Sequence, residues 1–201
     1  MSHPSRFSFL LLTLAFAVGC GQNNPTSDSP NGSKSTSNTD TPSAGMQWAA
    51  TEHFRGEVSR ECLASAGSLM TPTTVINFAD VRSGLMVQVR RADPQANPMP
   101  MGFHAILFAP KQAALSNQFI YDSLVAVTRR STTQSDEAIQ VGGFPGTRIV
   151  SIVDEKGTTA SETFAVTPQG VIAISALLPA EDYKLVLPEL NRFTSSFKLL
   201  P

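Results

Sequence analysis

Cysteine is scarce in this sequence, because only Cys20 and Cys62 occur among its 201 residues. Two thiols exclude the multi-disulfide framework of a small secreted scaffold. An excess of one charge is also lacking: 15 Lys and Arg stand against 16 Asp and Glu, for a net charge of −1. That balance excludes the basic footprint of a nucleic-acid-binding protein. A membrane-spanning run is missing too, since the apolar residues 9–18 rise only ~15 Å as a helix, about half of a bilayer core.

The N-terminus nevertheless carries a targeting pattern. Arg6 and the amino terminus precede the apolar run FLLLTLAFAV (9–18), and small residues close it. A charged region, a short apolar region and small residues in that order are typical of a secretory signal. We therefore expect residues 1–19 to be a signal peptide that is removed from the mature protein.

The end of this run resembles the lipobox of bacterial lipoproteins, in which an aliphatic residue and two small residues precede an invariant cysteine. The stretch reads AVGC (17–20), with Ala17 where leucine is usual. The resemblance implies cleavage between Gly19 and Cys20, a diacylglycerol thioether on Cys20, and an acyl chain such as palmitate on its new amino group. Gly21 favours the outer membrane, on its periplasmic or surface side, over the inner membrane. The alternative is an ordinary signal cut at a preceding alanine, which leaves Cys20 a free thiol.

A polar stretch separates this region from the rest of the chain. Residues 21–45 consist mainly of Ser, Thr, Asn, Pro and Gly and hold no large apolar side chain. Such a segment buries too little surface to offset the entropy of ordering it. We expect residues 20–45 to be the lipidated cysteine and a disordered linker of roughly 25 to 30 Å root-mean-square length. Residues 46–201 are of a size that suits one domain.

Apolar periodicity predicts an α+β domain, with an antiparallel sheet of about six or seven strands packed against two helices. The expected strands are residues 73–80, 84–91, 103–110, 137–143, 146–154, 160–167 and 170–178. Ser83 and Gly84 predict a hairpin between the first two strands, and the last three form a meander. Three prolines in residues 92–102 predict a long loop. The glycines of GGFPG (142–146) predict a tight turn.

Two segments are expected to be helical. In residues 112–130, one helical face carries Leu115, Phe119, Ile120, Leu124 and Val127. Near the C-terminus, Pro188 predicts either a helix that begins near Leu187 or two short helices that abut there. The residues expected to face the sheet from this second helix are Leu187, Leu190, Phe193 and Phe197.

The last hundred residues resemble the PsbP/MOG-like fold that is shared with DcrB-type lipoproteins. The resemblance rests on NQFIYDSLVAVTRR (117–130), on GGFPGTRIVSIV (142–153) and on RFTSSFKLL (192–200), in the order helix, glycine turn and terminal helix. Residues 46–102 match the pattern poorly. The fold includes a photosystem II subunit and Ran-binding nuclear proteins, so the resemblance implies an accessory or binding module by analogy.

Cys62 and two histidines are the residues that bear on catalysis. If Cys20 is lipidated, Cys62 has no partner in the chain, and we expect it to be a buried, inert thiol rather than to pair between chains. A nucleophilic pair of Cys62 and His104, oriented by Asp80 or Asp93, is the enzymatic alternative. No catalytic motif surrounds Cys62, so the sequence predicts no catalytic residue.

Two stretches bear on metal binding. In EHFRGEVSREC (52–62), a helix would place His53, Glu57 and Glu61 on one face, which suits either a metal or a solvated surface, and we favour the surface. In PMPMGFH (98–104), Met99, Met101 and His104 would suit Cu(I) in a copper carrier.

Together, these patterns predict a non-enzymatic, membrane-anchored accessory or binding module of the bacterial envelope, without a cofactor. Its expected partners are a lipid bilayer, reached through acyl chains, and a protein or small ligand that the sequence does not identify. Nucleic acid is not among them.

Overall fold

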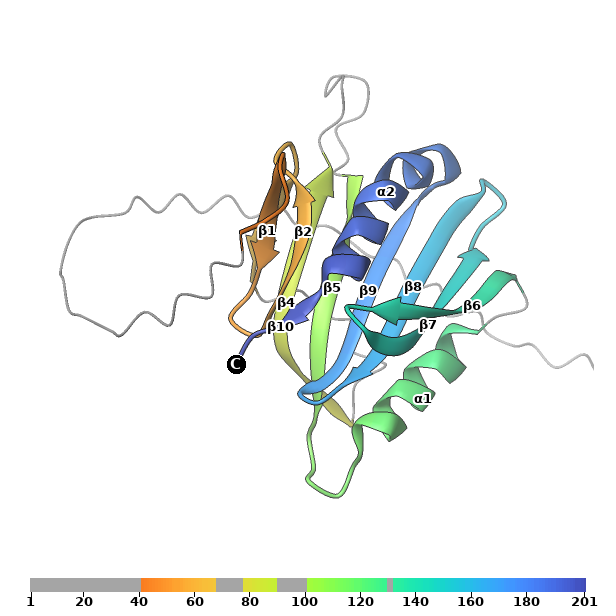
Figure 1. Cartoon of the computed structure of the whole chain (residues 1–201). Coiled ribbons are helices and arrows are strands. Elements are labelled where there is room, and N and C mark those ends of the chain that lie inside the picture. The colour runs from red at the N-terminus through yellow and green to blue at the C-terminus, as the bar shows by residue number, and fades with distance from the viewer. Residues whose placement is uncertain (1–40, 68–77, 90–100, 130–131) are drawn as a thin grey trace, which may run out of the picture. The chain divides into compact units, whose positions relative to one another are not determined.

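The computed structural model describes residues 41–67, 78–89, 101–129 and 132–201 (Figure 1). The expected signal peptide, Cys20 and nearly all of the linker lie outside the described residues. So do most of the expected loop at 92–102 and most of the expected strand at 73–80. No helix in the described part of the chain is long and apolar enough to cross a membrane.

Ten strands and two helices make up the described residues. A small antiparallel sheet has the order β1-β2-β10, from Met46–Ala50, Phe54–Ser59 and Lys198–Leu199. A seven-stranded antiparallel sheet has the order β3-β4-β5-β9-β8-β7-β6. Its strands are β3 (Leu63–Ala66), β4 (Ala79–Val89), β5 (Met101–Pro110), β6 (Thr133–Val141), β7 (Phe144–Ile152), β8 (Thr158–Thr167) and β9 (Gly170–Pro179). The helices are α1 (Asn117–Thr128) and α2 (Ala180–Ser196). The α+β prediction, with about seven strands and two helices, is confirmed.

The seven-stranded sheet carries a hydrophobic core on each face. Successive side chains of a strand point to opposite faces, and β8 illustrates this: Phe164 joins the core beneath α1, whereas Ala165 joins the core beneath α2 and the small sheet. The α2-side core is the larger, with 20 buried residues. Figure 1 shows α2 lying across β5 and β9, beside the small sheet.

The predicted hairpin near Ser83 is wrong. Residues 79–89 form one strand, β4, with an irregularity in its pairing to β5 between Val81 and Ser83. Gly84 is buried inside this strand rather than placed in a turn. The extra residue at this irregularity is Arg82, whereas Ser83 and Gly84 pair regularly with Leu107 and Ile106 of β5.

Helix α1 is shorter than predicted because Ser116 caps its start. The Ser116 hydroxyl accepts the backbone N–H of Phe119 at 3.1 Å, so the helix begins at residue 117 rather than 112. Ile120 and Leu124 are buried as expected, but Phe119 is 47% exposed and Val127 is 58% exposed. The face of α1 that is buried is therefore rotated by part of a turn from the predicted apolar face.

Helix α2 is continuous, and both predicted arrangements around Pro188 are wrong. Proline removes the hydrogen bond to the carbonyl four residues earlier, which belongs to Lys184. Lys184 and Pro188 are both exposed, so water can reach the free carbonyl. Leu190 and Phe193 are buried against the sheet as predicted, and so is Phe197 beyond the end of the helix.

Candidate functional site

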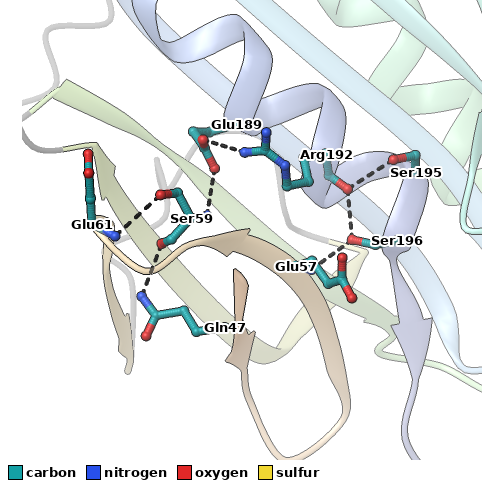
Figure 2. Close-up of polar contacts among 8 residues, drawn as sticks. All are labelled: Gln47, Glu57, Ser59, Glu61, Glu189, Arg192, Ser195 and Ser196. Atoms are coloured by element: carbon teal, nitrogen blue, oxygen red, sulfur yellow. Dashed lines mark hydrogen bonds and ion pairs between the residues drawn. The ribbon is translucent and has the colours of Figure 1, made fainter. Parts of the chain in front are cut away.

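A shielded ion pair joins α2 to the small sheet (Figure 2). Arg192 bonds to Glu189, which precedes it by one turn of α2, and the Glu189 side chain is only 12% exposed. The other carboxylate oxygen of Glu189 accepts the backbone N–H of Ser59, at the end of β2, at 2.9 Å. A carboxylate withdrawn from water is costly unless it has such partners. The three residues therefore fix α2 against β2.

Cys62 lies beside this ion pair and is 3% exposed, within the α2-side core. Burial raises the pKa of the Cys62 thiol to about 11, aided by the negative charge of Glu189 and a hydrogen bond to it, whereas Arg192 acts weakly in the opposite direction. The thiolate is the nucleophilic form of cysteine. At neutral pH Cys62 is therefore a protonated thiol facing a carboxylate, and its predicted burial is confirmed.

We expect native Cys62 to resist a soluble aromatic disulfide reagent at neutral pH and to react at once in denaturant, because the thiol is both buried and protonated. Absorbance of the released thiolate measures the rate. A matched control is Ser65→Cys in β3, where all four residues are exposed, and this thiol is expected to react without denaturant. Rapid native labelling of Cys62 would contradict the description of the thiol as inert.

The neighbouring polar side chains are also held by the chain itself (Figure 2). The amide of Gln47 donates to the carbonyls of Ser59 at 3.2 Å and Cys62 at 2.7 Å. The hydroxyl of Ser196 accepts the N–H of Glu57 at 2.7 Å and donates to a carbonyl of α2 at 2.7 Å. The side chains of Gln47 and Ser196 thus bond to backbone groups of β2, of Cys62 and of α2. Bonds of this kind hold these segments together.

The predicted helical face of His53, Glu57 and Glu61 is wrong. Residues 54–59 form strand β2, in which residues four apart lie ~13 Å apart rather than on adjacent turns. The Glu57 carboxylate accepts the N–H and the hydroxyl of Ser43. Within residues 41–67, 78–89, 101–129 and 132–201, no three His, Cys, Asp or Glu side chains gather as a metal site would require.

The proposed pair of Cys62 and His104 is also wrong. His104 lies in β5, and both of its neighbours in that strand face the core that contains Cys62. Alternation places His104 on the other face of the sheet. Asp80 is an exposed residue that bonds to Lys111 at 3.7 Å, and Asp93 lies outside the described residues.

The proposed copper loop does not bring its ligands together. Met101 begins strand β5 instead of lying in a loop, and it is 3% exposed in the α2-side core. His104 follows three residues later, and residues an odd number apart in a strand point to opposite faces. Met99 lies outside the described residues. The set of Met99, Met101 and His104 is therefore wrong as a ligand group.

His104 instead belongs to a polar row across the α1-side face of the sheet, which we call the cross-strand row. Met86 of β4, His104 of β5, Ser175 of β9 and Glu162 of β8 are register partners in turn. All four are half-buried, in strands whose neighbouring residues are mostly core. Alternation within each strand could have indicated their common face, but not that β5 lies beside β9.

Comparison with known proteins gives similarity to solved structures only. No family model matches the chain, and no curated protein matches it. LpqN of Mycobacterium tuberculosis, a protein involved in cell envelope biogenesis, matches over 71% of this chain and 93% of its own, with 14% identity and a TM-score of 0.46. The cyanobacterial PsbP of Synechocystis sp. PCC 6803 matches over 80% of this chain and 96% of its own, with 8% identity and a TM-score of 0.47. A PsbP structure is thus among those to which this chain is similar, as the sequence resemblance predicted.

Proposed function

We propose that this chain is a lipid-anchored accessory module of the bacterial envelope, which binds a protein or small ligand and performs no catalysis. The observation that carries the proposal is the run FLLLTLAFAVGC (9–20), which ends on a cysteine and is followed by a polar linker. Two or three acyl chains, at about 0.8 kcal/mol per buried methylene, hold a protein firmly on a bilayer. The linker then lets the domain reach partners at some distance from the membrane surface.

The burial and protonation of Cys62 support a non-enzymatic protein over the main alternative, an enzyme that uses Cys62 as a nucleophile. An enzyme built on Cys62 needs a thiolate near neutral pH and a base beside it. The pKa of Cys62 is raised to about 11, and its polar neighbour is a carboxylate that is itself tied to Arg192. His104, the candidate base, lies on the opposite face of the sheet. These features favour a thiol that serves packing.

Replacing the cysteine that would carry the lipid tests the proposal. We expect Cys20→Ser to move the protein from the membrane fraction to the soluble fraction, because one hydroxyl cannot replace the acyl chains. Immunoblotting of fractionated cells measures the distribution, and mass spectrometry of the wild-type N-terminal peptide is expected to show the acylated Cys20.

Cys62→Ala is the matched control, since it removes the other cysteine and is expected to leave the protein in the membrane fraction. If Cys20→Ser is distributed like the wild type, or if the N-terminal peptide carries no acyl chain, the lipid-anchored function is wrong.

A further inference from the structure

Arg148 of β7 lies on the α2-side face of the large sheet. Its register partner Thr163 on β8 is fully buried and precedes Ala165 of the α2-side core by two residues, so all three share this face. The Arg148 Nε donates to the Thr163 hydroxyl at 3.1 Å, and its Nη1 donates to the side-chain oxygen of Asn191 on α2 at 2.6 Å. Two bonds from one planar group fix the guanidinium between the sheet and the helix.

The charge of Arg148 is not neutralised by any residue that the structure describes. Both of its partners are neutral side chains, and it takes part in none of the ion pairs of the described residues. Arg192 on α2, by contrast, pairs with Glu189. Arg148 is half-buried, and its neighbours Asn191 and Glu137 are exposed, so this edge of α2 is open to solvent. The Nη2 of Arg148 donates to no described residue and is left to bind a ligand.

A buried hydroxyl without a partner lies on the same face. Ser161 precedes Thr163 by two residues on β8, a distance of ~7 Å along the strand, and is the register partner of Val150 on β7. The Ser161 side chain is fully buried, yet its hydroxyl bonds to no other described residue. A buried polar group that lacks a hydrogen bond costs free energy. An unpaired hydroxyl near an unneutralised guanidinium indicates a place for a ligand that accepts hydrogen bonds from both.

The surroundings of Arg148 select a carboxylate that carries an apolar portion. A carboxylate matches the planar guanidinium and forms charge-assisted hydrogen bonds, which are the stronger class. Val150 follows Arg148 by two residues on the same face of β7, and Leu187 precedes Asn191 by one turn of α2. Both aliphatic side chains are half-buried, so a ligand can cover more of their surface. An inorganic anion such as phosphate would leave that surface in water.

We propose that Arg148 and Ser161 bind the carboxylate group of a small ligand, whose apolar portion covers Val150 and Leu187. Arg148 supplies the charge, and Ser161 supplies a hydrogen bond that its hydroxyl lacks in the free protein. Glu137, the register partner of Arg148 on β6, faces the same side of the sheet and opposes an anion. The inference rests on the ligand binding in the proposed function and names the chemical class of that ligand. It does not involve lipid anchoring, which Cys20→Ser tests separately.

Titration of the processed full chain in detergent with butyrate tests the site. In 1H–15N NMR spectra we expect the Nε–H signal of Arg148 to shift saturably with butyrate but not with butyramide, which has the same chain without the charge. Backbone amide signals of β7 report binding in the variants. Arg148→Gln is expected to weaken butyrate binding at least about tenfold, because it removes a charge-assisted hydrogen bond. Arg82→Gln is the matched control, since Arg82 is an exposed arginine that also donates to a neutral group, the Gln169 carbonyl, and it is expected to bind like the wild type.

Two further variants keep the test valid if Arg148→Gln folds poorly. Ser161→Ala is expected to raise the urea midpoint of the ligand-free protein, because it removes a buried hydroxyl that has no partner, and to weaken butyrate binding roughly two- to tenfold, the effect of one hydrogen bond. Glu137→Gln is expected to tighten butyrate binding, because it removes the opposing charge. No saturable shift of the wild-type Arg148 signal, equal binding of butyramide, phosphate binding as tight as that of butyrate, or unchanged butyrate affinity in Arg148→Gln or Ser161→Ala would overturn the proposal.

Discussion

Phe193→Ala is expected to lower the free energy of unfolding by about 3 to 5 kcal/mol, the range for truncating a fully buried phenylalanine. Phe193 is completely buried in the α2-side core. Its ring lies 5.3 Å from the ring of Phe103 on β5 and 6.4 Å from that of Phe197, both edge-on. The ring also packs directly on Gly56 of β2, where no side chain would fit. Its loss leaves a cavity where α2, the large sheet and the small sheet meet.

Urea unfolding followed by fluorescence measures this effect, because Trp48 is the only tryptophan and lies in β1 of the small sheet. Leu185→Ala is the matched control: it truncates an apolar residue of the same helix that is 60% exposed, and we expect a change within ±0.5 kcal/mol. Equal losses for the two variants would show that burial of Phe193 does not hold the sheets together.

Strands β6 to β9 and the C-terminal helix were predictable because their patterns lie within short stretches of the sequence. Strands β6 to β9 are joined by short turns that contain or adjoin glycine, and β7 to β9 are rich in β-branched and apolar residues, so their positions agree with the predicted ranges to within a few residues. The C-terminal pattern of Leu190, Phe193 and Phe197 identified the buried face correctly. The break at Pro188 was predicted from propensity alone, and packing of the helix against the sheet overrides it.

The small sheet was not predictable because its pairing is distant in sequence. Strand β10 has two residues, Lys198 and Leu199, which pair with Arg55 and Phe54. A two-residue strand has no alternation to detect, and its partner lies near the opposite end of the domain. The link from the ion pair to the small sheet had the same limit, since the N–H of Ser59 donates to Glu189 across 130 residues. Near Cys62 the sequence indicated only a buried thiol.

Metal ligands were predicted in the wrong sets for one physical reason. Spacing along the sequence indicates neighbours only when the type of element is known, and residues 54–59 of the first stretch and 101–104 of the second lie in strands. In a strand, Met101 and His104 point apart, whereas the true neighbour of His104 is Met86, 18 residues earlier on the adjacent strand. Cross-strand register therefore decides which side chains can share a ligand.

Gly142→Ala is expected to cost about 3 kcal/mol or more in unfolding free energy, although it adds a single methyl group. Gly142 has a φ of +57° in the turn between β6 and β7, where the predicted glycine turn is confirmed. A Cβ there would lie on the backbone carbonyl oxygen of Phe197. The Gly142 N–H also donates to the carbonyl of Thr194 at 2.9 Å. Any shift that relieves the overlap weakens this bond between the turn and the end of α2.

Gly143→Ala separates the clash from the cost of the left-handed backbone. Gly143 lies in the same turn with a φ of +89°, yet nothing lies within 4 Å of an added Cβ. We expect it to cost only about 1 kcal/mol, the penalty of a positive φ for a residue with a side chain. Urea unfolding of the two variants under the same conditions gives the difference directly. If Gly142→Ala is no more destabilising than Gly143→Ala, the end of α2 is not locked against this turn, and the glycine pair serves only to reverse the chain.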